Sequence, residues 1–246
     1  MNDRPAALVT GASRGLGQAL ALRLAERGHP VVLVARADEP LQDVVTRIRA
    51  RGGRLAHAVV GDLGRPDDAR SIAAQATALV GRVGLLVHNA SSLGPLPMPA
   101  LADTRPEDLL AVLEVNLLGP FRLTRALLGG LALGQGGTIV HISSDAAVEA
   151  YPGWGAYAVS KAALDHLSRV WAAELGESGV RVLSVDPGEM DTRMHADAVP
   201  DADRWALADP DVVARRILAL LEDSVGAPSG ARRIAAQWSA DGEVTA

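Results

Sequence analysis

The chain of 246 residues contains no cysteine, which excludes disulfide bonds, thiolate catalysis and zinc sites built on cysteine. Aromatic residues make up only 3% of the chain, so a buried core must consist mainly of alanine, leucine, valine and isoleucine. No apolar run approaches the ~20 residues that a membrane helix needs, and the first residues lack a signal-peptide pattern. A net charge of −5 argues against nucleic acid and anionic membranes as partners. We therefore expect a cytoplasmic protein.

Lysine is almost as scarce as cysteine. Of the 24 basic residues, all but Lys161 are arginine. An ammonium is compact and offers three donors from one atom, whereas a guanidinium is a broad planar fork. Tyrosine occurs only as Tyr151 and Tyr157, and Tyr157 precedes Lys161 by one helical turn. A cation beside a phenol is expected to lower the phenol's pKa, which would suit acid–base chemistry. The alternative is a surface Tyr–Lys pair without a function.

Ser144 follows the apolar run 137–142, which predicts a buried strand. A hydroxyl at the carboxyl end of such a strand would face the crevice where α/β proteins bind ligands. There it could hold a carbonyl oxygen while Tyr157 donates a proton to the same oxygen.

A glycine-rich turn follows the first predicted strand, with Gly11, Gly15 and Gly17 ahead of a helix. Glycines let the backbone approach a phosphate closely, and the helix N-terminus supplies amide donors. This spacing differs from the usual dinucleotide fingerprint, and an ordinary strand–helix turn is the alternative.

The end of the second predicted strand indicates which nicotinamide cofactor would bind. An acidic residue there would hold the adenosine ribose, whereas arginine accommodates a 2′-phosphate. Here the strand closes with Ala35, and Arg36 comes next. Arg14 could reach the same phosphate from the glycine turn. We interpret Asp38 as the N-cap of the next helix rather than as a ribose ligand. The pattern predicts NADP(H) rather than NAD(H).

Predicted strands and helices alternate along the whole chain. Strands are expected at 6–10, 31–35, 55–60, 84–88, 137–142, 180–185 and 233–237, and helices at 18–27, 39–51, 66–80, 106–131, from around Tyr157 to about 177, and 211–221. This alternation predicts an α/β fold, a doubly wound parallel sheet of about seven strands with helices on both faces. We expect one domain over residues 1–246, a substrate lid within 189–209 and a polar tail at 239–246.

Several motifs in this order resemble the short-chain dehydrogenase/reductase family, in its shorter type. The resemblance extends from about residue 6 to residue 237 and rests on 10–17, Asp62, 88–90, Asn116, Ser144, Tyr157, Lys161, Pro187, Gly188 and Thr192. Two positions depart from the family pattern: His88 replaces a common asparagine, and Glu189 stands where an apolar residue is usual. The double glycine often found in the family's last strand is also missing.

The resemblance implies a Rossmann-like fold and a role for each matching residue. Tyr157 would be the acid–base catalyst, Ser144 would polarise the substrate oxygen, Lys161 would lower the pKa of Tyr157 and bind the nicotinamide ribose, and Asn116 would fix a water next to Lys161. The implied cofactor-binding residues are Gly11, Ser13, Arg14, Gly15, Leu16, Gly17, Arg36, Asp62, Leu63, Asn89, Ala90, Tyr157, Lys161, Pro187, Gly188 and Thr192. The family also implies a homodimer or homotetramer joined through its two long helices.

We therefore expect an NADP(H)-dependent oxidoreductase that interconverts a small-molecule carbonyl and a secondary alcohol. The large side chains Met98, Trp154, Met190, Met194 and Trp205 predict a mostly apolar substrate pocket, unless they pack under the lid and never meet a ligand. Two alternatives stay open. One is a reductase of another substrate class, such as a pterin, a sugar or an acyl thioester, and the other is a non-catalytic NADP(H)-binding sensor.

Overall fold

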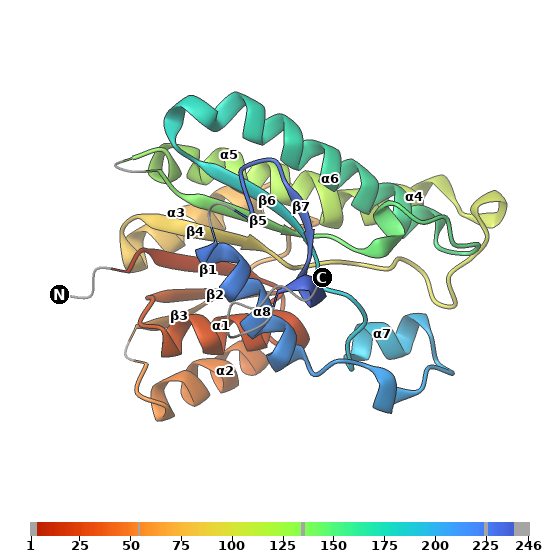
Figure 1. Cartoon of the computed structure of the whole chain (residues 1–246), viewed down its shortest axis with the longest axis horizontal. Coiled ribbons are helices and arrows are strands. Elements are labelled where there is room, and N and C mark those ends of the chain that lie inside the picture. The colour runs from red at the N-terminus through yellow and green to blue at the C-terminus, as the bar shows by residue number, and fades with distance from the viewer. Residues whose placement is uncertain (1–3, 54, 134–135, 224–225, 239–246) are drawn as a thin grey trace.

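The structure is a computed structural model, and it describes residues 4–53, 55–133, 136–223 and 226–238. Within these residues, seven parallel strands form one sheet in the order β3-β2-β1-β4-β5-β6-β7 (Figure 1). The strands are β1 (Ala6–Thr10), β2 (Val31–Ala35), β3 (Ala56–Val60), β4 (Val83–His88), β5 (Thr138–Ile142), β6 (Arg181–Asp186) and β7 (Arg232–Ile234). The predicted seven-stranded parallel sheet is thus confirmed, whereas the predicted tail at 239–246 lies outside the described residues.

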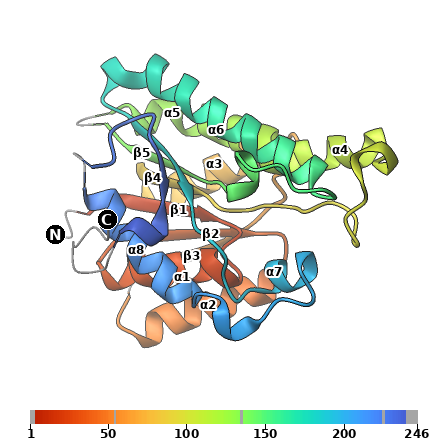
Figure 2. The ribbon, with the colours of Figure 1, turned by 45° about the vertical axis from the view of Figure 1, so that its right-hand side comes forward.

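Helices cover both faces of the sheet, as Figures 1 and 2 show from two directions. One face carries α1 (Gly15–Glu26), α2 (Asp38–Ala50) and α8 (Pro210–Glu222), and the other carries α3 (Asp68–Val80), α5 (Gly119–Leu131) and α6 (Gly155–Leu175). The shorter α4 (Pro106–Leu113) contacts α6, and α7 (Arg193–Ala198) lies after β6. No helix among the described residues is long and apolar enough to cross a membrane.

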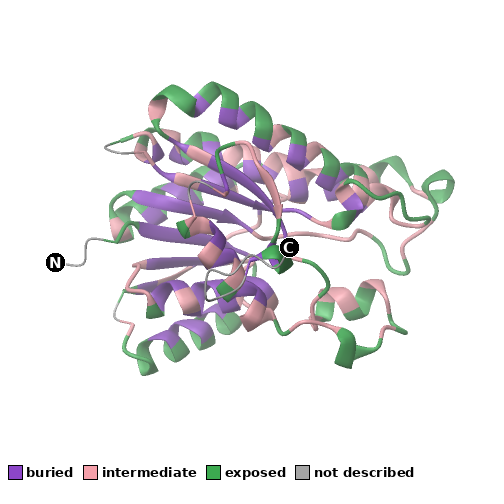
Figure 3. Ribbon diagram, in the orientation of Figure 1, coloured by how far each residue is buried: buried purple, intermediate pink, exposed green. Residues whose placement is uncertain are grey.

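Aliphatic side chains fill the space between the sheet and each helical layer. Strand β1 is buried along its whole length, as is most of β2, because helices pack on both faces of these strands (Figure 3). Their continuous valine, leucine and alanine runs are typical of strands buried on both sides. The two buried clusters therefore pack against the sheet from opposite sides.

The strand order reverses between β1 and β4, and this reversal sets the position of the site. Because all strands are parallel, their carboxyl ends meet at one edge of the sheet. The loops after β1, β4, β5 and β6 all leave from that edge. Ligands of such sheets bind in the crevice outside those strand ends.

Three local predictions need correction. The expected continuous helix over 106–131 is interrupted by a π-helical turn, Glu114–Leu118, which carries Asn116. The N-cap of α2 is Ala37, and Asp38 lies inside the helix, where its side chain accepts from Gln42 at 3.1 Å. The last strand ends at Ile234, because residues 235–237 form a 3-10 turn.

Two buried histidines lie side by side in the sheet. His88 of β4 pairs in register with His141 of β5, and their rings stack with centroids 4.9 Å apart. One nitrogen of each ring bonds a hydroxyl, Thr124 Oγ1 at 2.9 Å from His88 and Ser168 Oγ at 2.8 Å from His141. Burial lowers the pKa of His141 to about 3 and that of His88 well below its usual value. Both rings are therefore neutral in the folded protein.

This pair predicts a loss of stability in mild acid. The unfolded chain takes up protons on both rings near pH 6.5, whereas the folded chain does not until far lower pH. The free energy of unfolding should therefore fall as the pH drops from about 6.5 toward 3, by up to about 1.4 kcal/mol per pH unit for each histidine. Urea unfolding measures the free energy of unfolding at pH 7.5 and at pH 5. The loss between these two pH values should be smaller for His88→Asn than for wild type. The exposed control His166→Asn should keep the wild-type difference, and an equal difference in all three proteins would contradict this account.

Candidate active site

Helix α6 places Tyr157 and Lys161 on its buried face, against the end of β5. Tyr157 is 8% exposed and Lys161 is 2% exposed. The Lys161 ammonium donates to the carbonyl oxygen of Ile142 at 2.7 Å, and its nitrogen lies 5.5 Å from the centre of the Tyr157 ring. The alternative of an exposed Tyr–Lys pair is therefore wrong, because both side chains lie inside the protein.

Burial decides the protonation of this pair. It raises the pKa of Tyr157 to about 12, and hydrogen bonding to Ser144 offsets the rise only in part. It also lowers the pKa of Lys161 to about 8, although the charge of Asp165 opposes this shift. The sequence predicts that Lys161 depresses the pKa of Tyr157, but desolvation of the phenolate outweighs any such effect here. Tyr157 is therefore a protonated phenol at neutral pH.

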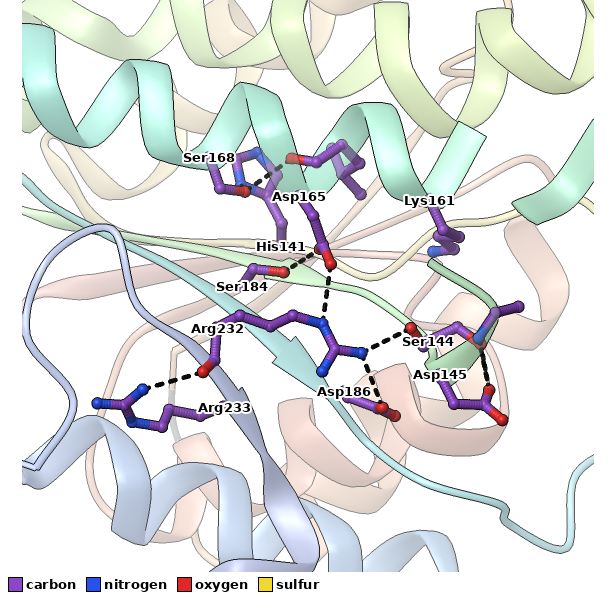
Figure 4. A network of polar contacts seen from close by, with 12 residues as sticks. His141, Ser144, Asp145, Lys161, Asp165, Ser168, Ser184, Asp186, Arg232 and Arg233 are labelled. Carbon is purple, nitrogen blue, oxygen red and sulfur yellow. Dashed lines mark hydrogen bonds and ion pairs between the residues drawn. The ribbon is translucent and has the colours of Figure 1, made fainter. Parts of the chain in front are cut away.

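Ser144 lies directly after β5, at the N-cap of the short turn Asp145–Ala147. Its hydroxyl donates to the Asp145 carboxylate at 2.8 Å and accepts from the Ala146 amide at 3.2 Å. Figure 4 shows Ser144 and Asp145 at the strand end, with Lys161 on the helix above. The structure thus brings the half-buried Ser144 to the same corner as the buried Tyr157.

Asn116 ties this corner to the loop after β4. Its amide nitrogen donates to Ser92 O and to Ser160 Oγ, each at 2.9 Å, and its oxygen accepts from the Ser92 amide at 2.7 Å. Ser160 directly precedes Lys161. Protein groups therefore engage both ends of this carboxamide, and Asn116 holds α6 against the loop.

The glycine turn between β1 and α1 is shaped by close backbone contacts. Gly11 and Gly15 have positive φ angles of 65° and 54°, which glycine adopts without strain. A Cβ at Gly11 would lie 2.9 Å from the Cα of Ala90, and one at Gly17 would collide with the carbonyl oxygen of Gly11. Leu16 is buried behind the turn, and the carbonyl of Ser13 accepts from Gln18 at 3.4 Å.

Asn89 and Ala90 support that turn from β4. The Asn89 side chain donates to the carbonyls of Thr10 and Gly11, at 2.9 and 3.2 Å. The backbone amides of Asn89 and Ala90 both donate to Thr10 Oγ1, at 3.0 and 3.1 Å. Thr10 therefore joins β1 to β4 at the reversal of strand order, a bridging role that the residue pattern alone did not predict.

Arg14, Arg36 and Asp62 follow β1, β2 and β3, three strands that lie side by side in the sheet. The turn is joined to β2 by the Ala12 amide, which donates to Val34 O at 3.1 Å, and β2 to the loop after β3 by the Gly61 amide, which donates to Ala35 O at 3.0 Å. Both arginines are exposed, and neither forms an ion pair with a described residue. Asp62 caps its own loop through the Gly64 amide at 2.9 Å, next to the buried Leu63.

The turn after β6 leads to Thr192, which lies opposite the glycine turn. Gly188 has a φ of 73°, and its amide donates to Asp186 Oδ1 at 3.0 Å, which fixes the turn at Pro187. Thr192 is the N-cap of α7 and accepts from the His195 amide at 3.2 Å. Its methyl group would lie 3.4 Å from a Cβ at Gly15, so Thr192 faces the glycine turn.

A family model described as short chain dehydrogenase matches residues 5–203. The chain belongs to the short chain dehydrogenase family. It is 33% identical over 226 residues to an uncharacterized oxidoreductase of Escherichia coli (strain K12), across 91% of this chain and 88% of that protein. It is 34% identical over 201 residues to an NADPH-dependent aldehyde reductase-like protein of Arabidopsis thaliana, across 78% of this chain and 74% of that protein.

Solved structures show the same relationship. A short chain dehydrogenase from Shigella flexneri 2a, complexed with NADP, superposes with a TM-score of 0.88 at 31% identity, over 96% of this chain and 98% of that one. This chain therefore shares the fold of solved short chain dehydrogenases.

The residues expected to line the substrate pocket do not all come together. Met98 and Trp154 lie with Tyr157 around a cavity of about 10 Å³, room for about one water. Met190 packs against the hydrophobic core and Met194 is half-buried on α7. Trp205 is 97% exposed on the turn Arg204–Ala206 and does not reach the pocket. The segment expected to form the lid thus contains a helix, α7, and a 3-10 turn.

Sequence reasoning missed Asp145 and Tyr151, which lie at the mouth of this short chain dehydrogenase's site. The Tyr151 hydroxyl donates to Asp145 Oδ2 at 2.9 Å, and its ring lies 6.1 Å from that of Trp154. Trp154 in turn contacts the Tyr157 ring edge-on, with centroids 5.8 Å apart. Their positions in the chain offered a hint: Asp145 adjoins Ser144, and Tyr151 is the only tyrosine besides Tyr157.

The packing of the glycine turn predicts the effect of adding one methyl group. Gly17→Ala should lower the free energy of unfolding by about 1–3 kcal/mol, because the new methyl displaces backbone rather than a flexible side chain. Gly129→Ala is the matched control, since nothing lies within 4 Å of a Cβ there and alanine is favoured in a helix by up to about 1 kcal/mol. Urea unfolding measures both. Equal stability of the two variants would show that the turn is not tightly packed.

Proposed function

We propose that the protein is an NADP(H)-dependent oxidoreductase that interconverts a carbonyl and a secondary alcohol, with Tyr157 as the acid–base. The observation that carries the proposal is the buried pair of Tyr157 and Lys161 beside Ser144, at the carboxyl edge of the sheet. An ammonium buried beside a phenol is unfavourable for stability alone. Its position at the strand ends supports a catalytic purpose.

The residues at the reversal of strand order fit a nicotinamide dinucleotide. Arg14 is the N-cap of α1, but its side chain accepts no hydrogen bond from the amides of the first helical turn. Those amides can therefore donate to an anionic phosphate. Gly11, Gly15 and Gly17 would hold the pyrophosphate, Asp62 the adenine, and Lys161, Pro187, Gly188 and Thr192 the nicotinamide end. When bound, the nicotinamide would supply or accept the hydride.

The remaining chemistry falls to the protein. Ser144 would donate its hydroxyl to the carbonyl oxygen and thereby give up its bond to Asp145. Tyr157 would give its proton to the same oxygen as the hydride reaches the carbon, which leaves a secondary alcohol and a phenolate. Lys161 would stabilise that phenolate until a proton returns from solvent. A phenol with a pKa of about 12 is protonated at neutral pH, which supports the reductive direction.

Charge at the mouth of the site favours an uncharged carbonyl substrate. The exposed carboxylates Asp145, Glu149 and Glu189 all raise the pKa of Tyr151, with the hydrogen bond to Asp145 as the largest contribution. Three negative groups at the entrance disfavour phosphorylated sugars and coenzyme A thioesters. The rings of Trp154 and Tyr151 offer apolar contact, so a neutral ketone or aldehyde fits better than either anionic class.

Two variants at the catalytic pair test the chemistry. Tyr157→Phe should abolish NADPH oxidation with a panel of neutral ketones, aldehydes, quinones and pterins, because only the proton donor is removed. Lys161→Arg should be nearly as damaging, since a planar guanidinium cannot take the place of the ammonium. NADPH affinity, measured by fluorescence titration, should stay close to wild type in Tyr157→Phe. Turnover of Tyr157→Phe above a few per cent of wild type, roughly two kcal/mol of barrier, would refute the assignment.

The cofactor preference is the second test of this function. Arg36 can form a charge-assisted pair with a 2′-phosphate, and Arg14 can approach it from the glycine turn. Each such hydrogen bond contributes roughly 1.5–3 kcal/mol, so two arginines give a preference of about a hundredfold or more. We expect wild type to prefer NADPH in kcat/KM, Arg36→Ala to weaken NADPH far more than NADH, and Ala35→Asp to move the preference toward NADH.

A wild-type preference for NADH would refute NADP(H) dependence and leave the catalytic residues untouched. A protein that binds NADPH but oxidises it with no carbonyl in the panel would favour the non-catalytic sensor.

A further inference from the structure

Arg232, the first residue of β7, joins three elements of the site through one guanidinium. Its Nε donates to Asp165 Oδ2 at 2.9 Å, and its Nη2 donates both to Asp186 Oδ2 at 3.0 Å and to the Ser144 carbonyl oxygen at 2.8 Å. Figure 4 shows this side chain reaching across β6 to the end of β5. A single residue thus connects β7 with α6, with the end of β6 and with the loop after β5.

Each of the three acceptors belongs to a segment that carries a proposed site residue. Asp165 lies on α6, one turn after Lys161, and also accepts from Ser184 Oγ of β6. Asp186 ends β6 and, through its other oxygen, holds the Gly188 amide. The third acceptor is the carbonyl of Ser144 itself, whose side chain bonds Asp145.

Charge and burial explain why arginine occupies this position. The side chains of Asp165 and Asp186 are only 7% and 6% exposed, whereas that of Arg232 is 26% exposed. Two buried carboxylates in proximity require a cation between them. A planar fork can serve several acceptors in fixed directions, which a single ammonium on a flexible stem cannot reproduce.

We propose that Arg232 is a positioning residue that holds the Ser144 backbone, and with it the Ser144 hydroxyl, in place for the substrate oxygen. The inference rests on the proposed function, because it requires Ser144 to act on that oxygen. Pairing of β7 with β6 through the backbone at 232–234 does not depend on this side chain. The guanidinium is therefore available for a role beyond closing the sheet.

A double-mutant cycle separates positioning from general structural support. Arg232→Lys keeps a positive charge beside the buried carboxylates and should fold. We expect it to lower kcat by about tenfold to a hundredfold, with a much smaller change in substrate KM, since a displaced catalytic group slows the reaction. In the Ser144→Ala background the same substitution should lower kcat by about twofold at most, because residues acting as a unit are not additive. The same fold-loss in both backgrounds would overturn the proposal.

Arg233→Lys is the matched control on the same strand. Arg233 donates to Gly226 O at 2.8 Å and to Arg232 O at 3.0 Å. Among the described residues, it bonds neither Ser144 nor the two buried carboxylates. Arg233→Lys should leave kcat unchanged in each of the two backgrounds. Loss of kcat in Arg233→Lys equal to that in Arg232→Lys would attribute the effect to the strand and overturn the proposal.

Hydrogen–deuterium exchange tests positioning without turnover. In Arg232→Lys, peptides covering 143–149 and 186–190 should exchange faster than in wild type and in Arg233→Lys, because the Ser144 carbonyl and Asp186 lose their partner. Unchanged exchange in both segments would overturn the proposal. If Arg232→Met also folds, it should show the same pattern more strongly. Full activity of Tyr157→Phe and Ser144→Ala would instead refute the proposed function, and exchange would still decide whether Arg232 orders these segments.

Discussion

The site depends on one geometric constraint, the parallel direction of every described strand. Because the strands are parallel, the ends of β1, β4, β5 and β6 meet at one edge of the sheet. Thr10 fixes that edge where the strand order reverses, with its hydroxyl bonded to the amides of Asn89 and Ala90. The glycine turn, Ser144 and the turn at Gly188 then come together, although up to 177 positions separate Gly11 from Gly188 along the chain.

Burial gives this edge its chemical character. Tyr157 and Lys161 both lie away from water, and desolvation disfavours the charged form of each, so the pKa of Tyr157 rises to about 12 and that of Lys161 falls to about 8. The Lys161 ammonium lies 5.5 Å from the centre of the Tyr157 ring, where it would favour a phenolate, while the charge of Asp165 favours the ammonium itself. The proton on Tyr157 and the charge on Lys161 are thereby coupled, which is useful in a reaction that leaves a transient phenolate beside an ammonium. An exposed pair would be screened by water and would lose most of this coupling.

Much of the site followed from the sequence because its residues are rare or sit at strand ends. Lys161 is the single lysine, and the buried strand before Ser144 fixed where that hydroxyl would lie. The sequence could not show that burial outweighs the effect of Lys161 on the pKa of Tyr157, because that balance depends on the packing around α6. Nor could it place Trp205, since the apolar character of an indole does not show whether the 189–209 segment folds over it or presents it to solvent. The π-helical turn at Asn116 was not predicted either, because a π-helical turn and an α-helical turn do not differ in local amino-acid composition.

Arg232 shows the limit of composition most clearly. Lysine could be singled out because it occurs once, whereas Arg232 is one of many arginines and carries no local motif. The role proposed for Arg232 depends on long-range contacts with Ser144, Asp165 and Asp186, which precede it by 88, 67 and 46 positions. Lys161 and Arg232 also differ in shape, and each shape suits its contacts. A compact ammonium fits beside a phenol at the end of β5, and a planar fork can bridge two carboxylates and a carbonyl. An arginine at 161 or a lysine at 232 would point its N–H donors in directions that do not match the acceptors there. The chain therefore uses arginine at every basic position except 161, where the site requires an ammonium.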